Sequence, residues 1–596
     1  MSSRTPGGTF LIRETLAEDV FTSCDFDEEQ KMLADSTTAF VDREIWPNKA
    51  RFECKDYAFT EEIMRKAGDL GLLKVGVPEA YGGLGMGFVS SMLVCDRISG
   101  GTGSIATAFG AHTGISISPI LIYGSEKIKK KYLPKLTSGE WFGAYCLTEP
   151  DAGSDANSGK TKAVRSEDGK HYAITGQKIW ISNAGFARVF IVFARIEDDK
   201  NITGFVVEYD PDNPNGITLG EEANKLGIRA SSTRQVFFNE TKVPADHLLG
   251  ERNGGFKIAV NALNIGRIRL AAACLDAQRR VIGNCIRYAN KRKQFEQPIS
   301  AFGAIQYKLA EMATRYYASE TSCYRTGHNI EEAIAALKKA REPEAELKSV
   351  AEYAIECAIL KVYASEAAQD CSDAGIQIYG GMGFSADTPM EAAWRDARIA
   401  RIYEGTNEIN RLLTVGMLVK RAMKGQLDLM GPALKVGKEL MDIPAFETPD
   451  YSELLSEELE LVGEMKKAVL MVAAKAVEKF GAKLREQQQI LLNIADMVIE
   501  TYTAESALLA TKKAAAQKGA DRVQTQVYMA RLNLYNALEK LGKNGREAIL
   551  STVEGDEQQM MRMGLKRFTR YTHLPNPIAL RKSIAADLIQ NDGLTF

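Results

Sequence analysis

The chain has 596 residues and a formal net charge of -2, with 45% hydrophobic and 26% charged residues. This length predicts several domains, and the composition is that of an ordinary soluble globular protein. The near-zero charge gives no support for nucleic acid as a partner. The nine cysteines form no CxxC pair and the five histidines share no ligand spacing, so we expect neither a disulfide framework nor a metal site.

The first half of the chain changes from a helical to a β pattern. Residues 1–26 form an N-terminal segment without a secretory or mitochondrial targeting pattern, and helical spacing dominates residues 27–143. Over residues 144–250, short β-branched and aromatic runs alternate with turn residues. Segments 171–175, 178–181 and 189–194 are examples. This pattern predicts an antiparallel β-barrel or sandwich.

Helical periodicity returns over residues 251–420, where four long helices predict a bundle. Residues 421–596 predict a further all-helical extension. It starts with a weak stretch that contains the breakers Gly431, Pro444 and Pro449. Segments 484–518 and 522–541 then predict antiparallel helices broken at Gly519. A sheet segregated between helical blocks makes the fold class α+β.

Glu404 does not suit its predicted position. Thr388 and Glu391 form a capping-box pattern with Pro389 between them, which predicts a helix start, and Gly405 predicts the helix end. Glu404 would then lie at the negative end of the helix dipole, which raises the pKa of a carboxylate. A raised pKa suits a general base working near neutral pH. The alternative is an ordinary solvated glutamate at a helix end.

Polar loops flank the predicted β-domain. Trp180 could cover one face of a flat heterocycle while the Ser182 hydroxyl reaches its edge, although Trp180 could equally fill the core. Arg292 follows a long helix and could neutralise a pyrophosphate, or it could be a solvated basic helix end.

Several long motifs, in the right order, resemble the acyl-CoA dehydrogenase family over about residues 30–420. Residues 146–155 (CLTEPDAGSD) and 377–396 (starting QIYGGMGF) resemble its two signatures, and 292–295 (RKQF) and 403–406 (YEGT) fall at its flavin contacts and catalytic loop. The helical extension of residues 421–596 resembles the very-long-chain branch.

The resemblance implies FAD as cofactor, held between the β-domain and the bundle, with part of the site supplied across a dimer interface. The cofactor-binding residues implied are Tyr145, Cys146, Leu147, Thr148, Gly153, Ser154, Trp180, Ile181, Ser182, Arg292, Gln294, Phe295, Gln377, Ile378, Tyr379, Gly380, Gly381, Thr406, Asn407 and Glu408. Residues near acyl-CoA would be Ser154, Ser231, Asn264, Arg267 and Gly405. Gly266 stands where a minority of the family carries its base, which leaves Glu404 as the catalytic candidate.

The implied reaction is the FAD-dependent α,β-dehydrogenation of a long-chain acyl-CoA to a trans-2-enoyl-CoA in fatty acid β-oxidation, with electrons passed to an electron-transfer flavoprotein. An acyl-CoA oxidase and a non-catalytic assembly factor are the alternatives. We expect a homodimer in a bacterial cytoplasm. Residues 414–445, with Met417, Leu418, Leu427, Leu429 and Met430 among basic residues, form a candidate peripheral membrane contact or a loosely packed linker.

Overall fold

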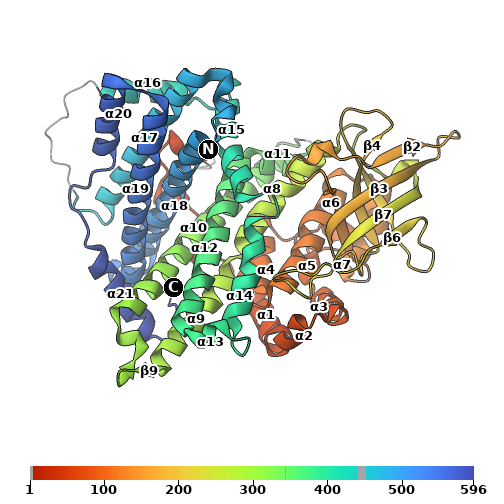
Figure 1. Ribbon diagram of the computed structural model, residues 1–596, viewed down its shortest axis with the longest axis horizontal. Coiled ribbons are helices and arrows are strands. Elements are labelled where there is room, and N and C mark those ends of the chain that lie inside the picture. Colours follow the sequence, from red (N-terminus) through yellow and green to blue (C-terminus); the bar gives the residue numbers. More distant parts are fainter. Residues whose placement is uncertain (1–4, 343, 441–450, 596) are drawn as a thin grey trace.

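The computed structural model describes residues 5–342, 344–440 and 451–595. Pro444 and Pro449, two of the predicted breakers, lie outside the described residues. Figure 1 shows three side-by-side masses, with the β-domain at the right, a central bundle and the C-terminal helical extension at the left. The predicted α+β class with an added helical extension is confirmed.

The N-terminal helices pack below the β-domain (Figure 1). The principal ones are α1 (Glu28–Phe40), α2 (Lys49–Glu53), α3 (Tyr57–Asp69), α4 (Phe88–Ser99), α5 (Gly103–His112), α6 (Ser118–Tyr123) and α7 (Glu126–Ser138). Helix α1 starts at a true capping box, because Asp27 accepts from the Gln30 N–H and the Gln30 side chain accepts from the Asp27 N–H. Helix α5 runs into a π-helical turn, Thr113–Ile117, before α6.

The β-domain has β1 (Gly143–Cys146), β2 (Lys162–Arg165), β3 (His171–Ser182), β4 (Val189–Ile196), β5 (Thr203–Glu208), β6 (Ile217–Leu219), β7 (Thr233–Pro244) and β8 (Leu248–Leu249). The strand order is β6-β7-β3-β2-β4-β5-β8, and β1 pairs with β4. The expected β-domain is confirmed, but its sheet is mixed, because β4 runs parallel to both β1 and β2. The two strands predicted at 171–175 and 178–181 are the single strand β3, which bulges where its register to β7 shifts.

The central bundle consists of α8 (Gly255–Ala273), α9 (Leu275–Lys291), α10 (Gly303–Lys339) and α12 (Ala354–Tyr379), as predicted. The shorter elements around it are β9 (Lys293–Gln294), β10 (Gln297–Pro298), α11 (Ala345–Glu352), α13 (Gly381–Phe384), α14 (Pro389–Ala397) and α15 (Asn407–Met423). Two helical stretches are long and apolar enough to span a membrane, Gly103–Tyr123 and Gly255–Lys291. Within the apolar 18-residue window of each stretch, 61% and 72% is buried, as in core helices.

The extension consists of α16 (Met430–Glu439), α17 (Ser456–Phe480), α18 (Gln488–Lys518), α19 (Gln524–Thr552), α20 (Gly555–Phe568) and α21 (Pro577–Gln590). The predicted break is confirmed at Gly519, whose φ of +91° ends α18. Helix α18 packs on α10 of the bundle, where buried pairs join Tyr317 to Thr511 and Arg325 to Ser506. Polar groups therefore fix how the extension sits on the bundle.

Candidate active site

The loop that carries Glu404 follows α14 and differs from its prediction. Helix α14 ends at Ala397 and gives way to a 3-10 turn over Arg398–Arg401, so the continuous helix expected up to Gly405 is wrong. Thr388 is the N-cap residue, but its hydroxyl donates to the Met382 carbonyl (2.7 Å) and it makes no capping bond. Glu404 and Gly405 both have left-handed backbone, with φ of +59° and +81°. Such a conformation is costly for a glutamate unless its surroundings impose it.

Three buried side chains impose this left-handed backbone by donating hydrogen bonds to consecutive carbonyls of the loop. Arg267 Nε donates to the Glu404 carbonyl (3.1 Å) and Lys361 Nζ to the Gly405 carbonyl (2.7 Å). Asn410 Nδ2 donates to the Gly405 carbonyl (2.8 Å) and to the Thr406 carbonyl (3.0 Å). The loop is therefore held from the bundle side, and its left-handed backbone is a built feature.

Sequence reasoning missed Lys361 and Asn410 in this arrangement. Lys361 is fully buried on α12 and also donates to Asn407 Oδ1 (2.7 Å). The available signal was a single lysine inside the apolar run 357–364 (CAILKVYA) of a long helix. A lysine is rarely fully buried without a polar partner, so this residue deserved a search for one.

The Glu404 carboxylate itself is left without a partner. Its Oε2 atom is buried, and no donor among the described residues bonds it. A Cβ at Gly266 would lie 2.5 Å from Oε2, so the space for the carboxylate exists only because residue 266 is glycine. Loss of hydration raises the pKa of Glu404 from its usual 4.5 to about 7, against the opposing charges of Arg267 and Lys361. Burial, and not a helix dipole, is therefore the main cause.

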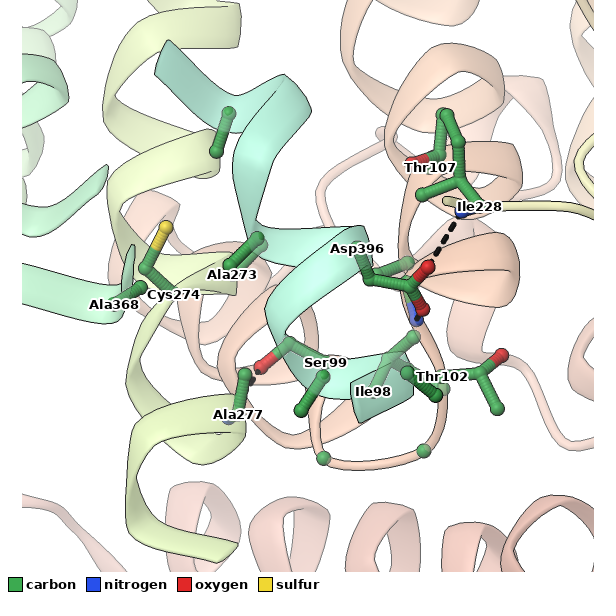
Figure 2. Close-up of a pocket in the computed structure, with 18 of the residues that line it drawn as sticks. Ile98, Ser99, Thr102, Thr107, Ile228, Ala273, Cys274, Ala277, Ala368 and Asp396 are labelled. Atoms are coloured by element: carbon green, nitrogen blue, oxygen red, sulfur yellow. Dashed lines mark hydrogen bonds between the residues drawn. The ribbon is translucent and has the colours of Figure 1, made fainter. Parts of the chain in front are cut away.

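Glu404 faces a cavity of about 640 Å³. Its wall combines the bundle (Gly266), the catalytic loop (Tyr403), helix α5 (Thr107 and Ala111) and the end of β3 (Ser182). Figure 2 shows another part of this cavity, with Ala273, Cys274 and Ala277 on the bundle side and Ile98, Ser99 and Thr102 on the N-terminal side.

Asp396 closes this part of the cavity wall. Its carboxylate accepts from the Ile228 N–H (2.5 Å) and the Gly103 N–H (3.0 Å), so α14 is joined to both the β-domain and α5 (Figure 2). The cavity thus depends on contacts between three regions of the chain. Asp396 is the last residue of the second signature, 377–396, but no role was predicted for it from the sequence.

Of the β-domain residues predicted to bind the cofactor, only Ser182 lines the cavity, and the exposure of the others varies. Trp180 is 64% exposed and has φ of +60° at the bulge of β3, while Ser182 lines the cavity. Tyr145 is buried with an unpartnered hydroxyl. Of the others, Cys146, Leu147 and Ile181 are buried, Thr148 is half-buried, and Gly153 and Ser154 are exposed.

A second group of predicted cofactor residues lies away from the β-domain. Arg292, Gln294 and Phe295 belong to the exposed β9–β10 hairpin, and residues 377–381 (Gln377, Ile378, Tyr379, Gly380 and Gly381) form the junction of α12 and α13. Figure 1 places β9 and α13 at the bottom of the molecule, far from β3. Phe295 is 87% exposed there. One chain therefore does not bring the two groups together.

The remaining predicted residues lie under or beside the catalytic loop. Asn264 and Arg267 are buried, and Arg267 Nη1 donates to Asn264 Oδ1 (2.8 Å) while Arg267 Nε holds the loop at the Glu404 carbonyl. Ser231 is buried with an unpartnered hydroxyl. Thr406 caps α15 by accepting from the Ile409 N–H (3.2 Å), Asn407 is buried against Lys361, and Glu408 is exposed.

Comparison with known proteins decides the family. Models of the acyl-CoA dehydrogenase N-terminal, middle and C-terminal domains match residues 27–140, 144–241 and 253–417, and a further acyl-CoA dehydrogenase C-terminal domain model matches residues 464–567. A probable acyl-CoA dehydrogenase of Bacillus subtilis (strain 168) is 41% identical over 99% of this chain and 98% of that protein. The chain belongs to the acyl-CoA dehydrogenase family. The predictions of this family and its enzyme class, and of FAD as its cofactor, are confirmed.

Two further acyl-CoA dehydrogenases show how far the likeness extends. The mitochondrial very long-chain specific acyl-CoA dehydrogenase of Bos taurus is 36% identical over 74% of this chain and 68% of its own length. The crystal structure of a Bacillus anthracis acyl-CoA dehydrogenase complexed with FAD is 40% identical, covers 99% of this chain and all of that one, and has a TM-score of 0.95. The helical extension of this acyl-CoA dehydrogenase is therefore shared with that solved structure.

Proposed function

We propose that this acyl-CoA dehydrogenase oxidises long-chain acyl-CoA to trans-2-enoyl-CoA in fatty acid β-oxidation and passes the electrons to an electron-transfer flavoprotein. The observation that carries the reaction is the Glu404 carboxylate, which faces the cavity with an unpartnered Oε2 atom and a pKa of about 7. A base of this pKa is half-ionised near neutral pH, where it can accept a proton and still be regenerated.

Ser182 at the cavity and two β-domain residues near it in the sequence or the fold, Trp180 and Tyr145, fit a flavin. An exposed indole at Trp180 and the Ser182 hydroxyl offer a flat face and a hydrogen-bonding edge beside Glu404's cavity, and the buried Tyr145 hydroxyl lacks a protein partner. Bound FAD would supply the hydride acceptor. Every other requirement falls on the protein, which must bind and orient the thioester, exclude water and remove a proton.

Glu404 would remove the proton from the carbon next to the thioester carbonyl, with Oε2 as the accepting atom. Charge then develops on the thioester oxygen, and a positioned N–H can stabilise it as in an oxyanion hole. Among the hydrogen bonds of residues 5–342, 344–440 and 451–595, none starts from the Glu404 backbone N–H. The same loop can therefore offer both the base and a free donor.

We propose that two copies of the chain complete each FAD site. Strand β3, which carries Trp180, and strand β9, which directly follows Arg292, lie at different ends of one chain (Figure 1). Phe295 on the β9–β10 hairpin is almost fully exposed. In a homodimer, the partner's hairpin would lie against β3 beside the cavity, where its arginine could bind the pyrophosphate of FAD. Arg292→Ala should lower FAD retention after gel filtration, while Arg287→Ala in the last turns of helix α9 should retain it. Equal FAD content in the two variants would contradict this arrangement.

The electron acceptor of the enzyme and its location in the cell belong to the same proposal. An acyl-CoA oxidase would be reoxidised rapidly by air, whereas a dehydrogenase in a bacterial cytoplasm should need an electron-transfer flavoprotein, so comparing the two reoxidation rates distinguishes them. A purely non-catalytic assembly role fails if acyl-CoA bleaches the bound flavin.

The proposed peripheral membrane contact falls on residues 414–445, of which 441–445 lie outside the described residues. Leu418 and Leu427 are buried, whereas Met430 is 54% exposed. Liposome flotation of the enzyme with Met430→Ser, compared with wild type, tests this contact. Equal flotation of the two proteins would contradict a contact through Met430 and favour the alternative of a loosely packed linker.

The proposed function is tested by anaerobic titration of the holoenzyme with acyl-CoA from C4 to C20. We expect flavin bleaching with saturated acyl-CoA, and fastest bleaching with long chains. No bleaching at any length would contradict the function, and a maximum at C4 would contradict the long-chain assignment.

A further inference from the structure

A half-buried arginine, Arg269, stands in the wall of the cavity that Glu404 faces and forms no ion pair with a described carboxylate. Arg269 lies on α8, three residues after Gly266, so both residues are on one helix face, about 4.5 Å apart along the axis. It lines the 640 Å³ cavity that Glu404 faces and also a second cavity of about 380 Å³. Phe109 lines both cavities as well, so Arg269 and Phe109 mark their common wall.

The guanidinium of Arg269 is only partly satisfied. Nη1 donates to the Thr113 carbonyl (2.9 Å), at the start of the π-helical turn. Nε is buried and has no hydrogen-bond partner among the described residues. Residues 76 and 114 are glycines, and a Cβ at either would lie within 4 Å of a guanidinium nitrogen. Because residues 76 and 114 have no side chains, space remains beside the Arg269 guanidinium at these two positions.

Two other arginines of the chain contrast with Arg269. Arg279 pairs with Asp276 (2.5 Å) and Arg325 pairs with Glu505 (2.8 Å). Arg269 forms no such ion pair with any described carboxylate. The second cavity beside it is lined by apolar residues such as Val94 and Ile117, and also by three charged residues, Glu331, Lys338 and Glu346. The buried Nε atom of Arg269 lacks an acceptor, which is unfavourable, and an anion that binds it would relieve this cost.

We propose that Arg269 forms a subsite that binds a carboxylate at the far end of the acyl chain, so that CoA monothioesters of dicarboxylic acids are substrates. This inference rests on the proposed function, because it requires the acyl chain to extend from Glu404 along α8. The thioester would lie beside Gly266 and Glu404, and the chain would reach the wall that Arg269 and Phe109 share. There the terminal carboxylate would pair with the unpartnered side of the guanidinium.

The test compares matched pairs of acyl-CoA, with and without a terminal carboxylate, at each chain length from C4 to C16. Arg269→Met removes the charge at similar volume, and Arg269→Lys keeps it. At the best length, we expect Arg269→Met to lower kcat/KM for the carboxylate-ended substrate by about tenfold or more, the size of a lost charge-assisted hydrogen bond. The unsubstituted substrate should change little, and Arg269→Lys should keep part of the preference.

Equal losses for both members of every pair would overturn the subsite and leave Arg269 as a cap for the Thr113 carbonyl. A wild-type enzyme that rejects terminal carboxylates at all lengths would overturn it too. Calorimetric binding of the same pairs to the Glu404→Gln holoenzyme needs no turnover. Failure of dehydrogenation and failure of the Arg269 subsite therefore give different results.

Discussion

Two glutamates of the chain, Glu149 and Glu404, both have carboxylates withdrawn from solvent, but their pKa values shift in opposite directions. Glu149, in the loop after β1, accepts from Lys178 Nζ (2.6 Å) and from the Lys160 N–H (2.5 Å). Burial alone would raise the pKa of Glu149, but the Lys178 charge and these hydrogen bonds outweigh it and lower the pKa. The Oε2 atom of Glu404 is also buried, and loss of hydration raises the pKa of this carboxylate to about 7.

The difference lies in what the neighbouring cations bind. Lys178 binds the Glu149 carboxylate, whereas Arg267 and Lys361 donate to the backbone carbonyls of residues 404 and 405. The second arrangement holds the loop while it leaves the carboxylate oxygen free. A buried carboxylate is suited to proton transfer when the neighbouring donors bind backbone carbonyls and leave its oxygen free. A buried carboxylate that is fully paired contributes to stability instead.

The largest effect should come from removing the base. Glu404→Gln keeps the shape of the side chain but cannot accept the proton, so flavin reduction by acyl-CoA should fall by about 10³-fold, within the range for general bases. FAD content and acyl-CoA binding should stay near wild type. Stopped-flow reduction under anaerobic conditions measures this rate, and a wild-type rate would remove Glu404 from the mechanism.

Gly266→Ala should displace the carboxylate without deleting it. The added Cβ would lie 2.5 Å from Glu404 Oε2, so the side chain must move. We expect a loss of about 10²-fold in kcat/KM from this misplacement, with thermal stability nearly unchanged. Gly463→Ala on helix α17 is the matched control, because nothing lies within 4 Å of its added Cβ and residue 463 does not line the cavity. Similar losses in both variants would show that the effect is not specific to Glu404.

Glu149→Gln should act on stability. It leaves the buried Lys178 without its counter-ion, which should cost about 3 kcal/mol, as removal of one partner of a buried ion pair does. The midpoint of thermal unfolding should fall, while the pH profile of the remaining folded enzyme should keep its shape. If Glu149→Gln instead shifted the pH profile, the contrast between the two glutamates would fail.

Lys361→Met should give the smallest effect. The Lys361 charge lowers the pKa of Glu404, so its removal should raise that pKa and move the activity profile to higher pH. At pH 7 the loss in kcat/KM should be about tenfold or less, because a shift of one unit corresponds to a tenfold change in ionisation. Lys361→Arg should keep the wild-type midpoint. A profile that moves to lower pH in Lys361→Met would contradict the assigned role.

Sequence patterns predicted the elements that depend on local signals. The bundle, the break at Gly519 and the β-domain follow from periodicity and from glycine conformation. The catalytic loop was harder, because the helix before it ends at Ala397 without a glycine or proline. Its left-handed Glu404 depends on Lys361 and Asn410, whose positions are fixed only by tertiary packing. Likewise, only the structure shows that Arg267 points at a backbone carbonyl.

The pH dependence of kcat/KM for a saturated acyl-CoA tests the central claim most directly, since it reports ionisations of the free enzyme. The Glu404 pKa is raised by burial and the ionised form is active, so activity should be low in acid, rise through a midpoint at about 7 and then level off. A midpoint near 4.5, the usual value for glutamate, or a flat profile from acid to neutral pH would contradict the account.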